Sequence, residues 1–351
     1  IVWGEKGRFM YFTSGVKARF HIFKLDLKKG DLTQITTGRY NYNAFGFAGK
    51  NIVVQRTDMS HAAELFTVDA KKGTATPFTQ VNKEIYSNLE FANVREHWIK
   101  TTTGEKMHVW LVLPPNFDST KQYPTLLYCQ GGPQSAISNY YSFRWNFELM
   151  ASQDYIIVAP NRHGVPTFGQ EWNHQISGDW GGQAMQDYLT AIDWASELNY
   201  VNKNKLGAVG ASYGGYSVYW LAGNHEKRFK CLIAHCGLYN LNSWYATTEE
   251  MFFANYDLKS TPWSRDWANV NKKFNPASFV KNWDAPILVI HGEKDFRVPV
   301  GEGIQAFNSA QLLGVKSRFL YFPDEGHWVL SPQNGLLWHR EYFRWLDEHL
   351  K

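Results

Sequence analysis

Cysteine is scarce in this chain: three thiols, Cys129, Cys231 and Cys236, occur among 351 residues. No two of them form a CxxC pair and none has a histidine at the spacing of a zinc site, so the sequence offers no metal-binding cluster. Cys231 and Cys236 fall on one predicted strand at an odd offset, which points them to opposite faces and argues against a disulfide between them. We therefore expect three buried, free thiols and no bound metal.

Long apolar runs and a dominant charge sign are also missing. No stretch approaches the roughly 18 apolar residues that a membrane-spanning helix needs, so we expect no membrane span. Lys and Arg number 36 against 32 Asp and Glu, and this near balance argues against nucleic acid as a partner. No Lys-Ser/Thr pair follows a glycine loop and no GxGxxG opens a helix, so no phosphate-bearing cofactor is expected.

The chain begins "IVWGEKG", with neither Met nor leader, and we expect a processed or truncated piece of a longer polypeptide.

The first hundred residues contain an internal repeat. "FKLDLKKGDLTQIT" begins at Phe23 and "FTVDAKKGTATPFT" begins at Phe66, which gives a period of 43 residues. Alternating apolar residues around KKG turns predict antiparallel strands, and a period of this size suggests β-propeller blades. Two blades cannot close a ring, so more blades or another chain would be needed; a simple two-unit β meander is the alternative. We assign residues 1–100 to this region.

After about Lys100 the pattern changes to strands that alternate with helices. Several strands are continuous apolar runs, as expected for a sheet covered on both faces, so residues 101–351 are predicted to form a doubly wound, mostly parallel α/β sheet. Ligands bind such sheets at the carboxyl ends of the strands. The strand candidates are 107–114, 125–130, 155–160, 205–210, 230–236, 285–292 and 317–323, and the helix candidates are 181–198, 213–224, 301–314 and 334–350.

Ser212 lies in "GASYGGY", between a predicted strand, "KLGAVG", and a predicted helix. This strand, turn and helix are the setting that the G-x-S-x-G motif requires. The glycines permit a strained turn, and the helix N-terminus favours negative charge beside the hydroxyl. We interpret Ser212 as a nucleophile; a purely structural glycine bend is the alternative.

A serine nucleophile needs a base and an acid that orients the base. In an α/β-hydrolase both follow the serine, the acid first, each at the end of a strand. Asp295 follows "APILVIHG" and His327 follows "SRFLYFPDEG", and we select these two. Glu293 and Asp324 compete for the acid role. His291 competes for the base role, but it lies on the strand and is expected to be a packed core histidine.

Attack on a carbonyl group also requires hydrogen-bond donors for the oxyanion. The backbone after the nucleophile, at Tyr213, is the first candidate. The second comes from "YCQGGPQ", where Gln130, Gly131 and Gly132 follow a predicted strand. A Gly-Gly-Pro turn without a chemical role is the alternative.

Six motifs occur in order along the second region: "GGP" at 131–133, "APNRHGVPTFGQEW" at 159–172, "GDWGG" at 178–182, "GASYGGY" at 210–216, "HGEKDFRVP" at 291–299 and "EGHW" at 325–328. With them the chain resembles the C-terminal portion of a prolyl oligopeptidase family serine peptidase, in which a β-propeller precedes an α/β-hydrolase domain. Within that family it is most similar to bacterial dipeptidyl-peptidase V-like enzymes and next to acylaminoacyl peptidases.

The resemblance implies the same triad of Ser212, Asp295 and His327, and oxyanion donors at Gly131, Gly132 and Tyr213. It places the aromatic segment 237–256 near the specificity pocket. Two positions depart from the family: Gln130 replaces a frequent Tyr or His, which leaves backbone donation to the oxyanion, and His163 replaces a usual Arg, whose ion pair should here be weakened or pH-dependent. Within and beside the aromatic segment, the substrate-binding candidates are Tyr239, Trp244, Arg297 and Val298. Arg297 could instead form a surface ion pair.

Together these observations predict a serine exopeptidase that forms an acyl-enzyme on Ser212 and releases N-terminal dipeptides with a small or hydrophobic residue at the cleaved position. An acylaminoacyl peptidase, a carboxylesterase and an inactive peptide-binding protein are the alternatives. Short peptides are the expected partners, no cofactor is implied and a homodimer stays open. The resemblance suggests a bacterial periplasmic or secreted protein. No residue can be assigned to the substrate's ammonium group.

Overall fold

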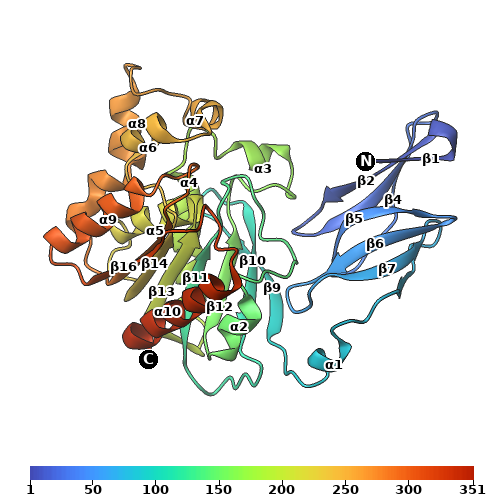
Figure 1. The fold of residues 1–351 in the computed structure, drawn as a ribbon, viewed down its shortest axis with the longest axis horizontal. Helices are drawn as coiled ribbons and strands as arrows, with labels where there is room; N and C mark the ends of the chain where they lie inside the picture. The colour runs from blue at the N-terminus through green and yellow to red at the C-terminus, as the bar shows by residue number, and fades with distance from the viewer.

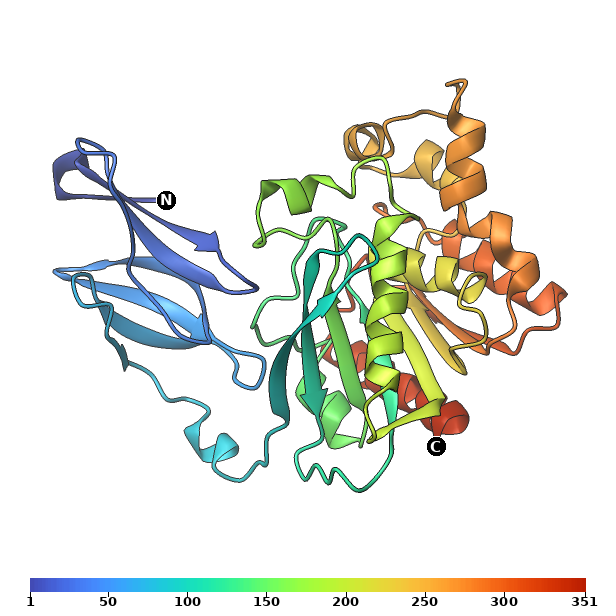
Figure 2. The same cartoon turned by 180° about the vertical axis from the view of Figure 1, so that it is seen from behind.

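The computed structural model describes residues 1–4 and 6–351, which form two small antiparallel sheets and one large mixed sheet (Figures 1 and 2). The small sheets have the same strand order. The first contains β1 (Val2–Gly4), β2 (Phe9–Gly15), β3 (Phe20–Asp26) and β4 (Leu32–Gln34), with η1 (Glu5–Gly7) after β1; the second contains β5 (Asn41–Ala48), β6 (Asn51–Thr57), β7 (Glu64–Asp69) and β8 (Ala75–Pro77), and α1 (Lys83–Tyr86) follows it.

The predicted 43-residue repeat is present in these two sheets, and the same turn chemistry closes the last hairpin of each. Asp26 Oδ1 accepts hydrogen bonds from the backbone of Lys28 and Lys29, and Asp69 Oδ1 accepts the same pair from Lys71 and Lys72. A glycine with positive φ completes each turn: Gly30 at 78° and Gly73 at 71°. The D-x-K-K-G pattern therefore specifies both hairpins locally.

The large sheet has eight strands in the order β16-β15-β14-β13-β11-β12-β10-β9. Strands β11 to β16 are parallel, whereas β10 is antiparallel to both of its neighbours. Its strands are β9 (Asn93–Lys100), β10 (Lys106–Leu113), β11 (Tyr123–Cys129), β12 (Ile156–Asn161), β13 (Val201–Ala211), β14 (Cys231–His235), β15 (Ile287–Gly292) and β16 (Ser317–Phe322). All seven predicted strands are present. The expected boundary at residue 100 is wrong, because β9 precedes it and forms an edge of this sheet.

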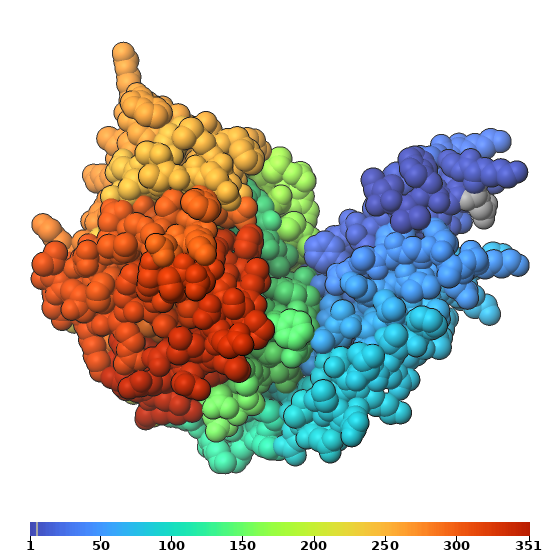
Figure 3. Space-filling model, viewed as in Figure 1, coloured from blue at the N-terminus to red at the C-terminus, as the bar shows by residue number. Residues whose placement is uncertain are grey.

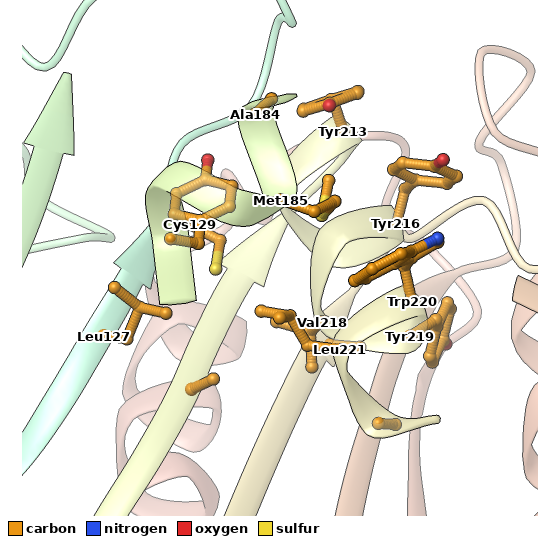
Figure 4. Close-up of a cluster of buried hydrophobic side chains, with 14 of the residues drawn as sticks. Leu127, Cys129, Ala184, Met185, Tyr213, Tyr216, Val218, Tyr219, Trp220 and Leu221 are labelled. Atoms are coloured by element: carbon orange, nitrogen blue, oxygen red, sulfur yellow. The ribbon is translucent and has the colours of Figure 1, made fainter. Parts of the chain in front are cut away.

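Helices cover both faces of the large sheet. The buried side chains of α4 (Gln183–Ser196), α5 (Tyr213–Ala222) and α9 (Gly301–Leu312) belong to the apolar cluster on one face, and those of α2 (Phe147–Ser152) and α10 (Pro332–Leu350) belong to the cluster on the other. In the close-up, side chains of β11, α4 and α5 meet around Leu127 and Met185 (Figure 4). The remaining helices are α3 (Gln170–His174), α6 (Leu241–Thr247), α7 (Met251–Leu258), α8 (Trp267–Phe274) and η2 (Pro276–Asn282). The four predicted helices are present, and the doubly wound α/β fold is confirmed.

Equivalent loops of the two repeats attach the small sheets to the large domain. In the loop between β2 and β3, Ala18 N donates to Thr167 Oγ1 and Ala18 O accepts from Asn139 N; in the loop between β6 and β7, Met59 N donates to Asn139 Oδ1. Ala18 and Met59 are buried in the same cluster as Trp110 of β10. The space-filling view shows the small sheets meeting the green segments and standing apart from the orange helices (Figure 3).

All three cysteines are buried and free, as the sequence predicted. Within residues 1–4 and 6–351, no helix combines the length and apolar character that crossing a membrane requires.

Candidate active site

Ser212 occupies a strained turn between β13 and α5. Its φ of 61° and ψ of −126° lie in a sparsely populated region for a residue with a side chain. The surrounding glycines are required by close packing: a Cβ at Gly210 would lie 2.6 Å from the carbonyl oxygen of Cys129, and one at Gly214 would lie 2.1 Å from the same atom. The glycines of "GASYGGY" therefore let strand and helix approach closely enough to present the serine at the end of the sheet.

His327 and Asp295 form a buried pair after β16 and β15. His327 Nδ1 lies 2.7 Å from Asp295 Oδ2, and Asp295 Oδ1 accepts hydrogen bonds from the backbone of Arg297 and Val298 at 3.0 and 2.9 Å. Both oxygens of the carboxylate are thus engaged, which fixes its orientation and holds the imidazole with its proton on Nδ1.

The competing acids lie on the surface, and the competing histidine packs beside Asp295 without taking the place of His327. Asp324 is exposed and pairs with Lys294 at 3.5 Å, and Glu293 is exposed. His291 is fully buried and its Nε2 donates to the carbonyl oxygen of Val298 at 2.7 Å. The structure therefore pairs Asp295 Oδ2 with His327 at 2.7 Å, whereas His291 Nε2 lies 3.6 Å from the same oxygen and is bound to the carbonyl oxygen of Val298.

Ser212 and His327 line one cavity of about 400 Å³. In the described part of the chain no hydrogen bond joins Ser212 Oγ to His327; instead His327 Nε2 lies 4.0 Å from Cys236 Sγ. The hydrogen bond between a catalytic serine and its histidine is often long without substrate and shortens when substrate binds. Cys236, Asp295 and His327 each offer one atom of a metal-ligating type within 4.8 Å of one another. In the structure these side chains contact one another: His327 Nδ1 is hydrogen-bonded to Asp295 Oδ2, and His327 Nε2 faces Cys236 Sγ.

The surroundings of His327 change its proton affinity in both directions. Burial lowers the pKa of His327, but Cys236 Sγ and the Asp295 carboxylate outweigh burial, and the pKa lies above its ordinary value of 6.5. A histidine that acts as a base must be neutral, so activity is lost as pH falls below this raised pKa.

We expect kcat/KM for a chromogenic dipeptide substrate to rise with pH through an apparent pKa above 6.5. Cys236→Ala should move this rise to lower pH, because it removes the sulfur beside Nε2. Cys231→Ala is the matched control, since its buried thiol lies against Trp345 and should leave the pH profile in place. A rise at or below pH 6.5 in the wild-type protein contradicts the expectation.

The oxyanion candidates also line this cavity. Gly131, Gly132 and Tyr213 are among its walls, and a Cβ at Gly131 would lie 3.4 Å from Ser212 Cβ, so this backbone passes directly beside the serine. The Gln130 side chain donates to Ser135 Oγ at 3.1 Å. The backbone of this loop thus remains the better candidate to serve an oxyanion.

Arg162 supports the oxyanion loop, a role that the sequence did not reveal. Its fully buried guanidinium donates to the carbonyl oxygens of Pro133 at 3.0 Å and of Gln130 at 3.4 Å, and it lies over the ring of Tyr213. The next residue, His163, contacts Asp187 through Nδ1 at 2.5 Å and Glu105 through Nε2 at 3.0 Å. Burial lowers the pKa of His163, but these two carboxylates raise it above its ordinary value.

Three aromatic rings and two aliphatic side chains form an apolar part of the cavity's lining. We call Trp180, Leu238, Trp244, Phe253 and Val298 the aromatic wall. Two substrate-binding candidates, Trp244 and Val298, belong to it. Tyr239 does not line the cavity, because its hydroxyl donates to Ser309 Oγ of α9 at 2.9 Å and its ring packs against Trp283. The assignment of Tyr239 to the pocket is corrected accordingly.

Two carboxylates share one guanidinium at the cavity. Arg297 lines the cavity, and its Nε lies 3.1 Å from Glu250 Oε1, while its Nη2 lies 3.5 Å from Glu249 Oε1. Glu250 also lines the cavity. Glu250 therefore brings a carboxylate to the cavity, whereas Glu249 pairs with Arg297 from outside the cavity's lining. Sequence reasoning missed Glu250, since nothing in "TTEEMFF" separates a surface glutamate from one in a cavity.

The fold and this site define an α/β-hydrolase domain with a serine on the turn after β13. The chain belongs to the prolyl oligopeptidase family, whose model matches residues 141–351. Dipeptidyl-peptidase 5 of Porphyromonas endodontalis is 50% identical over 344 residues, which cover 97% of this chain and 50% of that protein. Dipeptidyl-peptidase 5 of Porphyromonas gingivalis is 49% identical over 353 residues, covering 100% of this chain and 52% of that protein.

Among solved structures, an acylaminoacyl peptidase of Pyrococcus horikoshii superposes with a TM-score of 0.88 at 22% identity, covering 98% of this chain and 55% of that chain. At this level of identity the likeness concerns the fold. The chain spans about half the length of the curated relatives it matches.

Proposed function

We propose that this chain is the catalytic portion of a serine peptidase that releases N-terminal dipeptides from short peptides. The observation that carries the proposal is the arrangement of Ser212 on its strained turn and the His327–Asp295 pair around one cavity. The dipeptidyl-peptidase 5 relatives support the choice of reaction.

In this reaction Ser212 Oγ attacks the carbonyl carbon of the second residue while His327 Nε2 takes the hydroxyl proton. Backbone N–H groups of Gly131, Gly132 and Tyr213 donate hydrogen bonds to the oxyanion. The C–N bond then breaks, and His327 delivers its proton to the leaving amine. Water repeats the cycle on the ester, so the dipeptide leaves as a free acid and the serine regains its proton.

The aromatic wall receives the side chain of the second residue. It is composed of aromatic rings and aliphatic groups that line the cavity with Ser212. The ring centroid of Trp180 lies 5.7 Å from that of Trp244 and 5.8 Å from that of Phe253. Because none of the five side chains of the aromatic wall is charged, we expect a preference for small or hydrophobic residues at the cleaved position.

The substrate's free ammonium group is attracted by Glu250. This carboxylate lines the cavity that contains Ser212, where its Oε1 lies 3.1 Å from Arg297 Nε. Arg297 itself could donate a hydrogen bond to a substrate carbonyl group.

We also propose that the two N-terminal sheets belong to a β-propeller. Their equal strand order and the 43-residue repeat support this architecture over an isolated meander. A propeller above the site would limit substrates by size, which suits a peptidase better than a carboxylesterase.

Paired chromogenic dipeptides with a free or an acetylated amine test the reaction class. We expect the complete protein to prefer the free amine. Glu250→Gln should raise KM for the free-amine substrate about tenfold or more, since a hydrogen bond to a charged group is worth roughly 1.5–3 kcal/mol. Glu249→Gln is the matched control and should have a smaller effect, because Glu249 is not among the cavity's lining residues.

Preference for the acetylated substrate would replace the dipeptidyl proposal with an acylaminoacyl peptidase. Turnover of esters without any cleavage of peptide amides would indicate a carboxylesterase.

A further inference from the structure

A second cavity adjoins the cavity that contains Ser212. It measures about 640 Å³, and we call it the outer chamber. The two cavities share four residues, Tyr140, Arg144, Trp145 and Trp328. The rest of the outer chamber is lined largely by apolar groups, including Phe143, Val329, Leu330, Pro332 and Trp338. Its size falls within the range of ligand-binding cavities.

The outer chamber lies on the histidine side of the site. Arg144 Nη1 lies 3.4 Å from the carbonyl oxygen of His327, and the ring of Trp328 contacts the His327 imidazole edge-on. In the proposed reaction His327 gives its proton to the leaving amine, so the leaving fragment must lie beside this histidine. The side chain of the substrate's second residue contacts the aromatic wall. The outer chamber is therefore where the leaving fragment emerges.

Arg144 is a half-buried cation without an acidic partner. Across residues 1–4 and 6–351, its guanidinium forms no ion pair within 4.0 Å, and its one hydrogen bond is the long contact to His327 O. Neither an Asp nor a Glu lines the outer chamber. Three other arginines of the hydrolase region differ: Arg228, Arg297 and Arg318 each pair with two carboxylates. A guanidinium that is partly removed from water, and is left unpaired at a cavity, suits an anionic ligand.

We propose that Arg144 binds the terminal carboxylate of the leaving fragment, so that the enzyme favours short peptides that end one or two residues after the cleaved bond. This inference rests on the proposed function. Glu250 attracts the ammonium group in the inner cavity and Arg144 receives the carboxylate at the junction with the outer chamber, which matches the two charged ends of a short peptide. The surrounding rings of Tyr140, Trp145 and Trp328 contact its side chains.

The test compares Ala-Ala-Phe with its C-terminal amide, measured as the release of Ala-Ala by the complete protein. For wild type we expect kcat/KM for the acid to exceed that for the amide about tenfold or more. Arg144→Gln should reduce this ratio to near one, and Arg144→Lys should retain part of it because the charge remains but the planar fork is lost. Arg340→Gln, at an exposed arginine outside both cavities, is the matched control and should keep the wild-type ratio.

Equal cleavage of acid and amide by the wild-type protein overturns the inference, whether or not the Arg144 variants fold. An unchanged ratio in Arg144→Gln also overturns it. In both cases dipeptide release itself still stands. If neither peptide releases Ala-Ala while the free-amine chromogenic dipeptide is also inert, the proposed function fails and this inference fails with it.

Discussion

Ser212→Ala should lower kcat about a million-fold while leaving the fold intact. Loss of a serine nucleophile has an effect of this size in other triad enzymes, because the base and the oxyanion donors cannot act without it. The hydroxyl contributes little to stability, since no hydrogen bond from Ser212 Oγ occurs in the described part of the chain and the side chain faces the cavity. Thermal unfolding of the variant should therefore resemble that of the wild type.

Ser217→Ala is the matched control. Ser217 lies one turn further along α5, and its hydroxyl donates to the carbonyl oxygen of Tyr213 at 2.8 Å, so its loss affects packing and not the reacting atoms. A folded Ser212→Ala protein that keeps more than about a tenth of wild-type kcat would remove Ser212 from the mechanism.

Asp295→Asn should lower kcat about ten-thousand-fold, as the same change does in other triads. The structure explains why. The two backbone donors at Arg297 and Val298 hold the oxygen of the new amide at the Oδ1 position, and its NH₂ group then faces His327 Nδ1. Nδ1 must then accept a hydrogen bond, so the imidazole proton moves to Nε2, and Nε2 can no longer take the proton of Ser212.

Asp324→Asn serves as the control for this prediction, because Asp324 is an exposed acid on the neighbouring loop that pairs only with Lys294 among the described residues. We expect its kcat to stay within about twofold of wild type, as for most surface substitutions. An Asp295→Asn protein whose kcat also stayed within about twofold of wild type would show that His327 does not depend on Asp295.

The positions of Ser212, Asp295 and His327 could be predicted because their signals are local. Each follows a strand rich in apolar residues, and parallel strands bring their carboxyl ends to one edge of a sheet. The glycines beside Ser212 are likewise required by contacts within the turn and its adjacent strand, at Cys129.

Other features depend on neighbours far apart in the chain and could not be predicted. The contacts of Arg162 with the oxyanion loop, and the proposed roles of Arg144 and Glu250, arise from loops that only the fold brings together. Strand β9 was missed because its polar residues alternate at an exposed edge. Tyr239 was placed in the pocket on the composition of its segment, but the direction of the chain after β14 turns it towards α9.

Reaction of the complete protein with a fluorophosphonate probe, followed by peptide mapping, tests the central claim most directly. The structure predicts one covalent adduct, on Ser212, which is absent from Ser212→Ala and forms slowly in Asp295→Asn. A protein that cleaves peptides but carries no adduct on Ser212 after complete inactivation would contradict the assignment of Ser212 as the nucleophile.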